Sequence, residues 1–257
     1  MITLDLRVRH YSTEGQTAGR GDEAAFRHVE RDIEIPSTQA ALVLVDVWHD
    51  HYIASHIDRA LWIIRNRMVP AITAARRAGM VIVHAPSPPV AEQYPHVRRP
   101  SLSGGAPPME LASWPPSDFV RREGAYAAFK RPEGPVMEAA YRRAERYRIH
   151  PLVEPEETDW LVATGDELHA LCRERGLLHL VYAGFAANMC IPFRDYGIRA
   201  MRKRGYHCIL LRDCTTAIEG HDTVAELRAT KQAIRELEIT DTAVTTSSDH
   251  FIRACRG

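Results

Sequence analysis

Short apolar runs alternate with amphipathic stretches along most of the chain. Residues 41–45 read Ala-Leu-Val-Leu-Val, which is typical of a strand buried on both faces of a parallel sheet. Comparable runs predict strands, and apolar positions at helical spacing predict helices. The strands are expected at 80–83, 160–163, 178–182, 206–211 and 242–245, and the helices at 56–78, 166–175, 192–204 and 222–237. This alternation predicts an α/β fold, with a doubly wound, mainly parallel sheet and helices on both faces.

Two parts of the chain break this rhythm. Residues 1–37 are polar and mixed, and we expect an N-terminal arm with at most one edge strand, near residues 2–8. Residues 86–158 contain too many prolines for long helices or central strands, although a helical pattern occurs at 135–147. We expect this Pro-rich insertion to fold over the sheet edge or onto a neighbouring subunit. Residues 38–257 are expected to form a single domain that includes it.

The overall charge excludes some partners. The chain of 257 residues has 33 Lys+Arg and 33 Asp+Glu, so a chain-wide basic surface for nucleic acid is absent. No apolar run approaches the roughly 18 residues that a membrane span requires. The charged start MITLDLRVRH is unlike a signal peptide. We therefore expect a cytoplasmic protein that binds neither nucleic acid nor membranes.

Two side chains follow strands at positions where chemistry is expected. Ligands of doubly wound sheets bind at the carboxyl ends of the strands. Asp46 ends the run 41–45, where burial would raise its pKa, and Cys190 follows the strand 178–182. Pro192 favours a helix start beside Cys190, and a helix N-terminus would lower the pKa of the thiol. Each residue also has an ordinary structural explanation: a helix cap or salt bridge for Asp46, and a small buried side chain for Cys190.

Together these residues resemble a known family. The segment Gly-Phe-Ala-Ala-Asn-Met-Cys at 184–190 follows Leu-Val-Tyr-Ala, and Leu-Leu-Arg-Asp-Cys-Thr-Thr-Ala-Ile-Glu occupies 210–219. With Asp46, they resemble the isochorismatase-like cysteine hydrolases, among them nicotinamidases, N-carbamoylsarcosine amidases, and ureidoacrylate and biuret amidohydrolases. The resemblance implies that Cys190 is the nucleophile of an acyl-thioenzyme and that Asp46 is a general base and then acid. It also implies an oxyanion hole of the Ala186 and Cys190 backbone N–H groups, and a cis peptide bond between Phe185 and Ala186.

The family also has a lysine that holds the charges of this pair together. The chain contains three lysines, Lys130, Lys203 and Lys231. Lys130 directly follows the segment 124–129, Gly-Ala-Tyr-Ala-Ala-Phe, which resembles the segment that follows the family lysine, and we expect Lys130 to fill this role. Two other alignments stay open. If residues 118–122 are aligned with the family residues that end at the lysine, Arg122 takes the lysine position. Alternatively, 159–163 is the strand that matches the family strand, and the lysine segment has moved into the insertion.

We expect the substrate pocket to contain five further side chains, Trp48, His51, Arg122, Phe185 and Asn188. The Asp-x-His pattern with which nicotinamidases bind a divalent metal is missing after the strand 80–83. We therefore expect no metal and no cofactor.

The leading hypothesis is a cysteine hydrolase that cleaves a C–N bond of a small amide, carbamoyl or ureido compound. The alternatives are a vinyl-ether hydrolase of the isochorismatase type and a catalytically inert binding module on the same fold. Arginines such as Arg194 hint at a carboxylate-bearing substrate. Relatives assemble into oligomers, so we expect a homo-oligomer.

Overall fold

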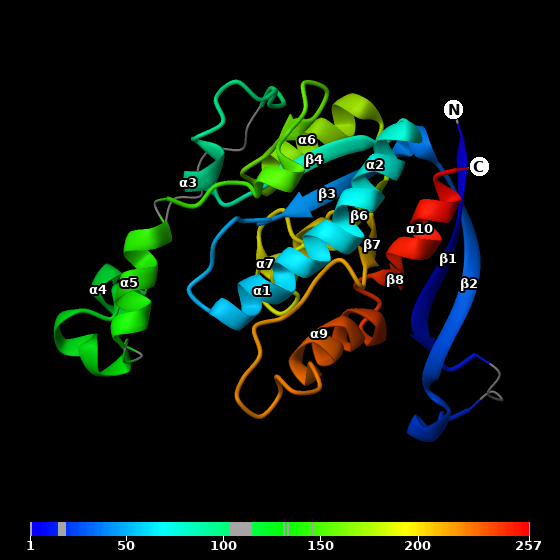
Figure 1. Ribbon diagram of the computed structural model, residues 1–257. Coiled ribbons are helices and arrows are strands. Elements are labelled where there is room, and N and C mark those ends of the chain that lie inside the picture. The colour runs from blue at the N-terminus through cyan, green and yellow to red at the C-terminus, as the bar shows by residue number, and fades with distance from the viewer. Residues whose placement is uncertain are drawn as a thin grey trace.

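The computed structural model describes residues 2–14, 19–102, 115–130, 132, 134–144 and 146–256. Within them, eight strands form one sheet in the order β2-β1-β8-β7-β6-β3-β4-β5 (Figure 1). Its parallel part comprises β3 (Ala40–Val45), β4 (Val81–Ala85), β5 (Trp160–Leu161), β6 (His179–Gly184), β7 (His207–Leu211) and β8 (Val244–Thr246). The strand β3 lies between β6 and β4 and is buried along its whole length, as the continuous apolar run predicts.

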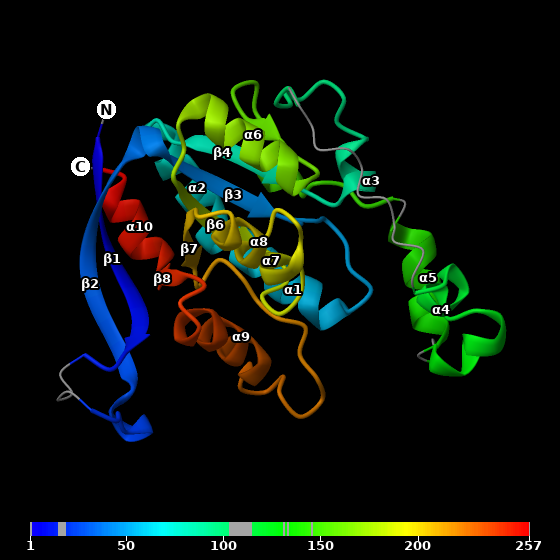
Figure 2. The same cartoon turned by 180° about the vertical axis from the view of Figure 1, so that it is seen from behind.

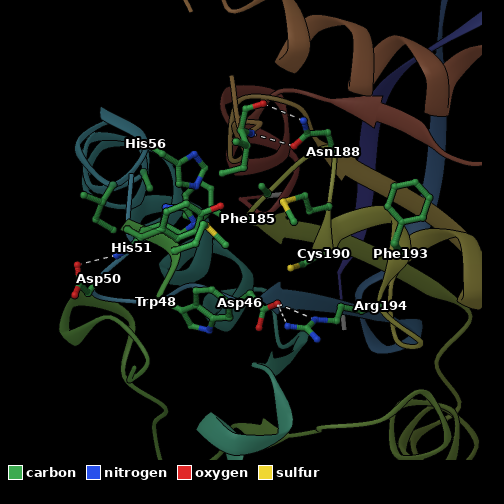
Figure 3. A pocket seen from close by; sticks show the side chains of 17 residues that line it. Asp46, Trp48, Asp50, His51, His56, Phe185, Asn188, Cys190, Phe193 and Arg194 are labelled. Carbon is green, nitrogen blue, oxygen red and sulfur yellow. Dashed lines mark hydrogen bonds and ion pairs between the residues drawn. The ribbon is translucent and has the colours of Figure 1, made fainter. Parts of the chain in front are cut away.

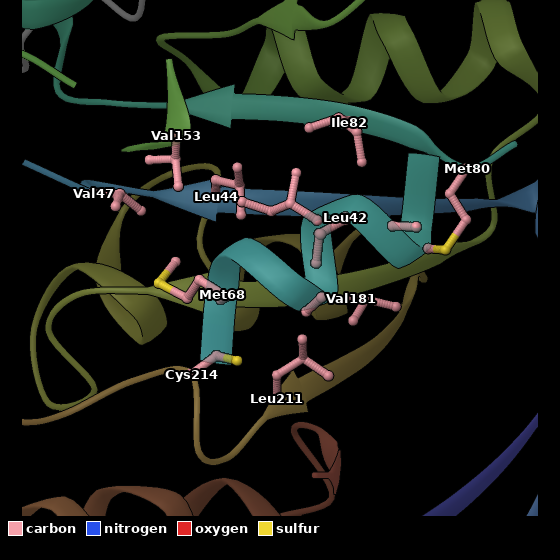
Figure 4. Packing of buried hydrophobic residues seen from close by; sticks show 14 of the residues in the cluster. Leu42, Leu44, Val47, Met68, Met80, Ile82, Val153, Val181, Leu211 and Cys214 are labelled. Carbon is pink, nitrogen blue, oxygen red and sulfur yellow. The ribbon is translucent and has the colours of Figure 1, made fainter. Parts of the chain in front are cut away.

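Helices cover both faces of this sheet, which confirms the predicted fold class. One face packs against α1 (Ala54–Ile63), α2 (Val69–Arg77) and α10 (Ser248–Ala254), and the other packs against α6 (Gly165–Arg175), α8 (Ile198–Lys203) and α9 (Arg228–Ile239) (Figures 1 and 2). Alternate side chains of β3 point to opposite faces, so Leu42 and Leu44 join the cluster around Met68 (Figure 4). Val43 packs with Leu168 of α6 on the other face.

The N-terminal segment is part of the sheet. Residues 3–36 contain two long antiparallel strands, β1 (Thr3–Ser12) and β2 (Arg27–Pro36), and β1 also pairs with β8. The expectation of at most one strand, at the sheet edge, was wrong. The segment forms two strands, of which β2 is the edge, and β1 is paired on both sides, with β2 and β8. Leu4, Leu6 and Val8 of β1 are buried at alternate positions, while most side chains of β2 are exposed and give little apolar signal.

Two expected helices differ in their details. Residues 54–77 form one continuous helical stretch, in which a π-helical turn, Ile64–Met68, joins α1 to α2. The helix expected at 192–204 is interrupted: α7 (Cys190–Phe193) ends at Arg194, whose backbone is extended, and α8 begins at Ile198. Gly197 lies in this break, and a Cβ atom there would lie 2.7 Å from the Ile191 carbonyl oxygen. The break allows the Arg194 side chain to turn back toward the sheet.

The Pro-rich insertion contains short helices. These are α3 (Pro88–Ala91), α4 (Ser117–Arg121), the 3₁₀ helix η4 (Gly124–Phe129), α5 (Pro135–Ala144) and the 3₁₀ helix η5 (Pro151–Val153); the proline-rich stretch at 103–114 lies outside the described residues. Figure 1 shows α4 and α5 to one side of the sheet and its helices. No residue of α4 or η4 is buried. Among the described residues, no helix is long and apolar enough to cross a membrane.

Candidate active site

Asp46 lies directly after β3 and is almost completely buried, with 2% of its surface exposed. Its backbone adopts the left-handed region, at φ 46°. The Oδ2 atom accepts hydrogen bonds from Nε of Arg194 at 3.0 Å and from a terminal guanidinium nitrogen at 2.9 Å (Figure 3). The Oδ1 atom is buried and has no hydrogen-bond partner of normal geometry among the described residues.

Burial and the neighbouring cation act on the Asp46 carboxylate in opposite directions. Burial raises the pKa of Asp46, and the positive charge of Arg194 opposes this rise. A carboxylate with a raised pKa is a stronger base, and the ion pair keeps it in the form that can accept a proton. The arrangement therefore suits a general base that is held in place by Arg194.

Cys190 is the first residue of α7 and is partly buried beside Asp46. Burial, followed by the negative charge of Asp46, raises the pKa of the Cys190 thiol to about 12, while Arg194 and the Ala186 N–H act in the other direction. The expectation that a helix N-terminus lowers this pKa was therefore wrong. The helix has four residues and contributes little, whereas a buried carboxylate lies next to the sulfur.

The loop after β6 brings Cys190 to Asp46. Gly184 has φ 130°, and a Cβ atom there would lie 2.0 Å from the Val45 carbonyl oxygen, so the loop passes β3 at a distance that only glycine permits. The Phe185 N–H donates to that same oxygen at 2.9 Å. The bond between Phe185 and Ala186 is cis, as expected. The Asn188 side chain fixes the far end of the loop through two 3.0 Å hydrogen bonds with the backbone of Ile218.

Two backbone N–H groups adjoin the sulfur. The Ala186 N–H interacts with the thiol and offsets part of the rise in its pKa. The Cys190 N–H belongs to the first residue of α7, where an amide has no partner within the helix. These are the two groups expected to form an oxyanion hole, and that role stays a prediction.

A cavity of about 630 Å³ lies in front of this pair. Of the five side chains expected in the pocket, Trp48, His51, Phe185 and Asn188 line it (Figure 3). Most of the remaining wall is apolar, and it includes Tyr52, Ile57, Met137, Met189, Phe193 and Ile218. The pocket is thus a large apolar chamber that ends at Asp46 and Cys190.

Lys130 and Arg122 do not reach this site, contrary to the sequence-based expectation. Lys130 is the exposed residue that ends η4, and Arg122 is the exposed residue that ends α4; neither lines the cavity. The physical reason is that α4 and η4 bury no residue, so nothing packs this segment against the strand ends. Lys203 and Lys231 are exposed as well. In the described part of the chain, the cation next to Asp46 is Arg194.

Sequence reasoning missed the pairing of Arg194 with Asp46, and it missed His56 as a residue of the cavity wall. Arg194 follows Cys190 by four positions, and its contact with Asp46 depends on the break between α7 and α8, which the expected continuous helix over 192–204 lacks. His56 lies in the first turn of α1, is 3% exposed and lines the cavity. The histidine-rich segment before α1 was a signal for pocket residues, but nothing distinguished the buried histidine from its neighbours.

No three His, Cys, Asp or Glu side chains of the described residues lie close enough together to hold a metal ion. The donor set around Asp46 consists of one thiol and one carboxylate that is already paired with Arg194. The residues present therefore do not make a conventional divalent-metal site.

The fold and the paired thiol and carboxylate define an α/β protein with a candidate cysteine nucleophile. Residues 40–243 match the family model described as the isochorismatase domain. The chain therefore belongs to the isochorismatase family of hydrolases.

Solved structures share this fold. A cysteine hydrolase from Pseudomonas syringae pv. phaseolicola is 15% identical, with a TM-score of 0.54, and the match covers 86% of this chain and 94% of that one. An isochorismatase family protein from Burkholderia thailandensis is 13% identical, with a TM-score of 0.51, and the match covers 86% and 97% of the two chains. No curated protein matches the sequence.

Proposed function

We propose that this protein is a cysteine hydrolase that cleaves a C–N bond of an amide, carbamoyl or ureido compound through an acyl-thioenzyme. The observation that carries the proposal is the state of Asp46. Arg194 holds Oδ2 of this buried carboxylate, and the carboxyl group also interacts directly with the Cys190 thiol. A base that is oriented in this way can remove the thiol proton as the sulfur attacks.

In the proposed first half-reaction, the Cys190 sulfur forms a bond to the carbonyl carbon while its proton moves to the Asp46 carboxylate. The carbonyl oxygen becomes an oxyanion near the N–H groups of Ala186 and Cys190. When the intermediate collapses, the C–N bond breaks and Asp46 returns its proton to the leaving nitrogen. A thioester on Cys190 and a free amine or ammonia result.

In the second half-reaction, a water molecule attacks the thioester and Asp46 takes up one of its protons. The C–S bond then breaks, the acid product leaves, and the proton returns to Cys190. Arg194 keeps its charge throughout because a guanidinium does not titrate in this range. Its role is to orient Asp46 and to favour the carboxylate, which is the role that the sequence analysis gave to Lys130.

Two alternatives remain distinct from this proposal. A vinyl-ether hydrolase would protonate its substrate from Asp46 and would not need the thiol. An inert binding module would need neither group. The close pairing of Cys190 with Asp46 supports the amidohydrolase, because a raised pKa keeps the proton on sulfur until a substrate carbonyl is in place.

Ammonia release from a panel of primary amides and ureido acids tests the proposal, with wild type, Cys190→Ala and Cys190→Ser compared. The account predicts release by wild type and a loss of at least about 10³-fold in both variants, the size expected when a nucleophile is removed. Circular dichroism checks that the variants are folded. Ammonia release that survives in Cys190→Ala would contradict the acyl-thioenzyme, and no release from any probe would favour the vinyl-ether hydrolase or the binding module.

We also propose that the chain forms a homo-oligomer through the insertion. Phe119, Val120, Phe129 and Val136 are large apolar side chains that are each at least 44% exposed, and they belong to the segment that lies beside the sheet in Figure 1. Exposed apolar patches of this kind typically mark interfaces. Sedimentation velocity of wild type and Phe129→Asp tests this: we expect a dimer or larger species that the substitution weakens. A monomeric wild type would contradict it.

A further inference from the structure

Two histidines form part of the cavity wall at the side of Phe185. His51 precedes α1 and His56 lies in its first turn, and their ring centres are 4.7 Å apart. The ring of His56 also meets the ring of Phe185 edge to face, at 6.1 Å. Since Phe185 is part of the loop that carries Cys190, this histidine pair borders the reacting group (Figure 3).

Hydrogen bonds to the backbone fix the tautomer of each ring. Nδ1 of His51 accepts the Ile53 N–H at 3.1 Å, so the proton of a neutral His51 is on Nε2. Nδ1 of His56 lies 3.2 Å from the Ala217 carbonyl oxygen, which can only accept, so the proton of a neutral His56 is on Nδ1. Nε2 of His51 is therefore a donor and Nε2 of His56 an acceptor, on rings whose centres are 4.7 Å apart.

Both rings are uncharged at neutral pH. Burial lowers the pKa of His51, and burial, followed by the neighbouring His51, lowers the pKa of His56 to about 4. No hydrogen bond from another described residue occupies Nε2 of either ring. The pair therefore offers one N–H donor and one nitrogen acceptor to a ligand, without a charge.

The rest of the wall favours a neutral ligand. Arg194 is the cation among the described residues that line the cavity, and it is already paired with Asp46. Asp46 and Asp50 also line the cavity, and Asp50 is paired with Arg143 at 3.9 Å, so these residues offer a carboxylate no free counter-ion. This weighs against the carboxylate-bearing substrate that the arginines suggested.

From this arrangement we infer that His51 and His56 select the substrate, and that the substrate is an uncharged, largely apolar carbonyl compound with a second neutral group that both accepts and donates a hydrogen bond. A carboxamide, lactam or heteroaromatic N–H beside a carbonyl has this pattern. The inference rests on the proposed function, because the ligand is a substrate only if the protein hydrolyses it. Binding of the ligand to the histidine pair can be measured without turnover.

Three aromatic amides of nearly equal shape separate the contributions. Isophthalamide carries a second carboxamide, 3-acetylbenzamide has a methyl group in place of its NH₂, and 3-carbamoylbenzoate carries a charge at the same position. We would measure their dissociation constants by calorimetry with Cys190→Ala, in which binding is separated from chemistry. An unpartnered polar group typically weakens binding by about 1–3 kcal/mol, so isophthalamide should bind roughly 5- to 150-fold more tightly than either of the others.

Variants then assign this difference to the histidines. In the Cys190→Ala background, His56→Leu should reduce the affinity for isophthalamide to that for 3-acetylbenzamide. The affinity for 3-acetylbenzamide itself should stay nearly unchanged. His51→Leu should instead lower the affinity for both compounds. His56→Gln retains an acceptor and should keep part of the preference. His49→Leu is the matched control, because His49 is an exposed residue of the same segment that does not line the cavity. Thermal unfolding checks that each variant is folded.

The inference is overturned if 3-carbamoylbenzoate binds best, if none of the probes binds, or if His56→Leu weakens all three equally. Wild-type ammonia release from isophthalamide is a separate readout. Selective binding without turnover would contradict the proposed hydrolysis and leave the recognition pair intact. Turnover of 3-carbamoylbenzoate in preference to isophthalamide would support the hydrolysis and contradict the pair.

Discussion

The guanidinium of Arg194 is paired with the buried carboxylate of Asp46, which also interacts with the Cys190 thiol. Both guanidinium contacts are made to Oδ2, at 3.0 and 2.9 Å, while Oδ1 is buried and unpaired among the described residues. The ion pair therefore supports the negative charge of Asp46 and leaves Oδ1 without a guanidinium contact. An arginine can do this but cannot exchange protons with its partner, so any proton transfer in the site belongs to Asp46 and Cys190.

The thiol of Cys190 should react slowly with iodoacetamide at neutral pH. Burial and the charge of Asp46 raise its pKa to about 12, so the thiolate fraction and the alkylation rate should increase about tenfold per pH unit up to pH 10. Asp46→Asn removes the negative charge and leaves Arg194 nearby, and it should accelerate alkylation at pH 7.5 by more than about tenfold.

Peptide mapping by mass spectrometry localises the label, because the other four cysteines are buried. Rapid labelling of Cys190 in the wild type at pH 7, with no acceleration in Asp46→Asn, would contradict the assignment of a protonated resting thiol.

Arg194 should act on catalysis through the pKa of Asp46. Its charge opposes the effect of burial, so Arg194→Met should raise this pKa further and move the acidic limb of the kcat/KM profile to higher pH. We expect a loss of at least about 10²-fold at pH 7, the lower end of what a general base contributes. Arg194→Lys keeps the charge and should restore part of the activity and the position of the limb. A lower rate with an unmoved pH profile in Arg194→Met would indicate a merely structural role.

Lys130 and Arg122 should be dispensable for the chemical step. Both are exposed and outside the cavity, so Lys130→Met and Arg122→Met should each retain kcat/KM within about twofold, in the range typical of surface substitutions. The same assay with Arg194→Met serves as the comparison. A hundredfold loss in Lys130→Met would mean that the insertion closes over the site and that Lys130 belongs to it.

Acid should weaken the fold through two histidines, the buried His56 and the half-buried His207. Burial, together with a second histidine nearby, lowers the pKa of both His56 and His207 to about 4, so the unfolded chain binds more protons than the folded one below pH 6.5. The stability that each neutral ring contributes is complete above about pH 6.5 and is lost as the pH falls toward 4, by up to about 1.4 kcal/mol per pH unit. Urea unfolding at pH 7.0, 5.5 and 4.5 measures this. His207→Phe should unfold with a shallower pH dependence than the wild type, and identical slopes would contradict the account.

The parallel sheet was predictable because its strands carry their own signals. The run 41–45 is apolar at every position, as required of a strand with helices on both faces, and glycines mark the ends of the following helices. The strand β2 was not predictable in the same way. Its side chains are mostly exposed, and its position at the edge depends on the pairing with β1 rather than on apolar spacing.

Asp46 and Cys190 could be named from the sequence because each follows a strand of this sheet. Arg194 could not, since its position depends on a helix break that propensity alone does not reveal. The Lys130 expectation followed a local resemblance in a segment that lacks buried side chains, and such a segment has nothing to hold it near the strand ends. The direction of the Cys190 pKa shift also required the structure, because it depends on the carboxylate that the fold places next to the sulfur.

The most direct test of the central claim is to look for the acyl group on Cys190. Wild type would be mixed with an amide that it hydrolyses, quenched in acid within the first turnover, digested and analysed by mass spectrometry. The account predicts that the peptide containing Cys190 gains the mass of the acyl group, that the gain disappears with hydroxylamine, and that Asp46→Asn shows no gain. Ammonia release with no adduct in the wild type, at an undiminished rate in Cys190→Ala, would contradict the account.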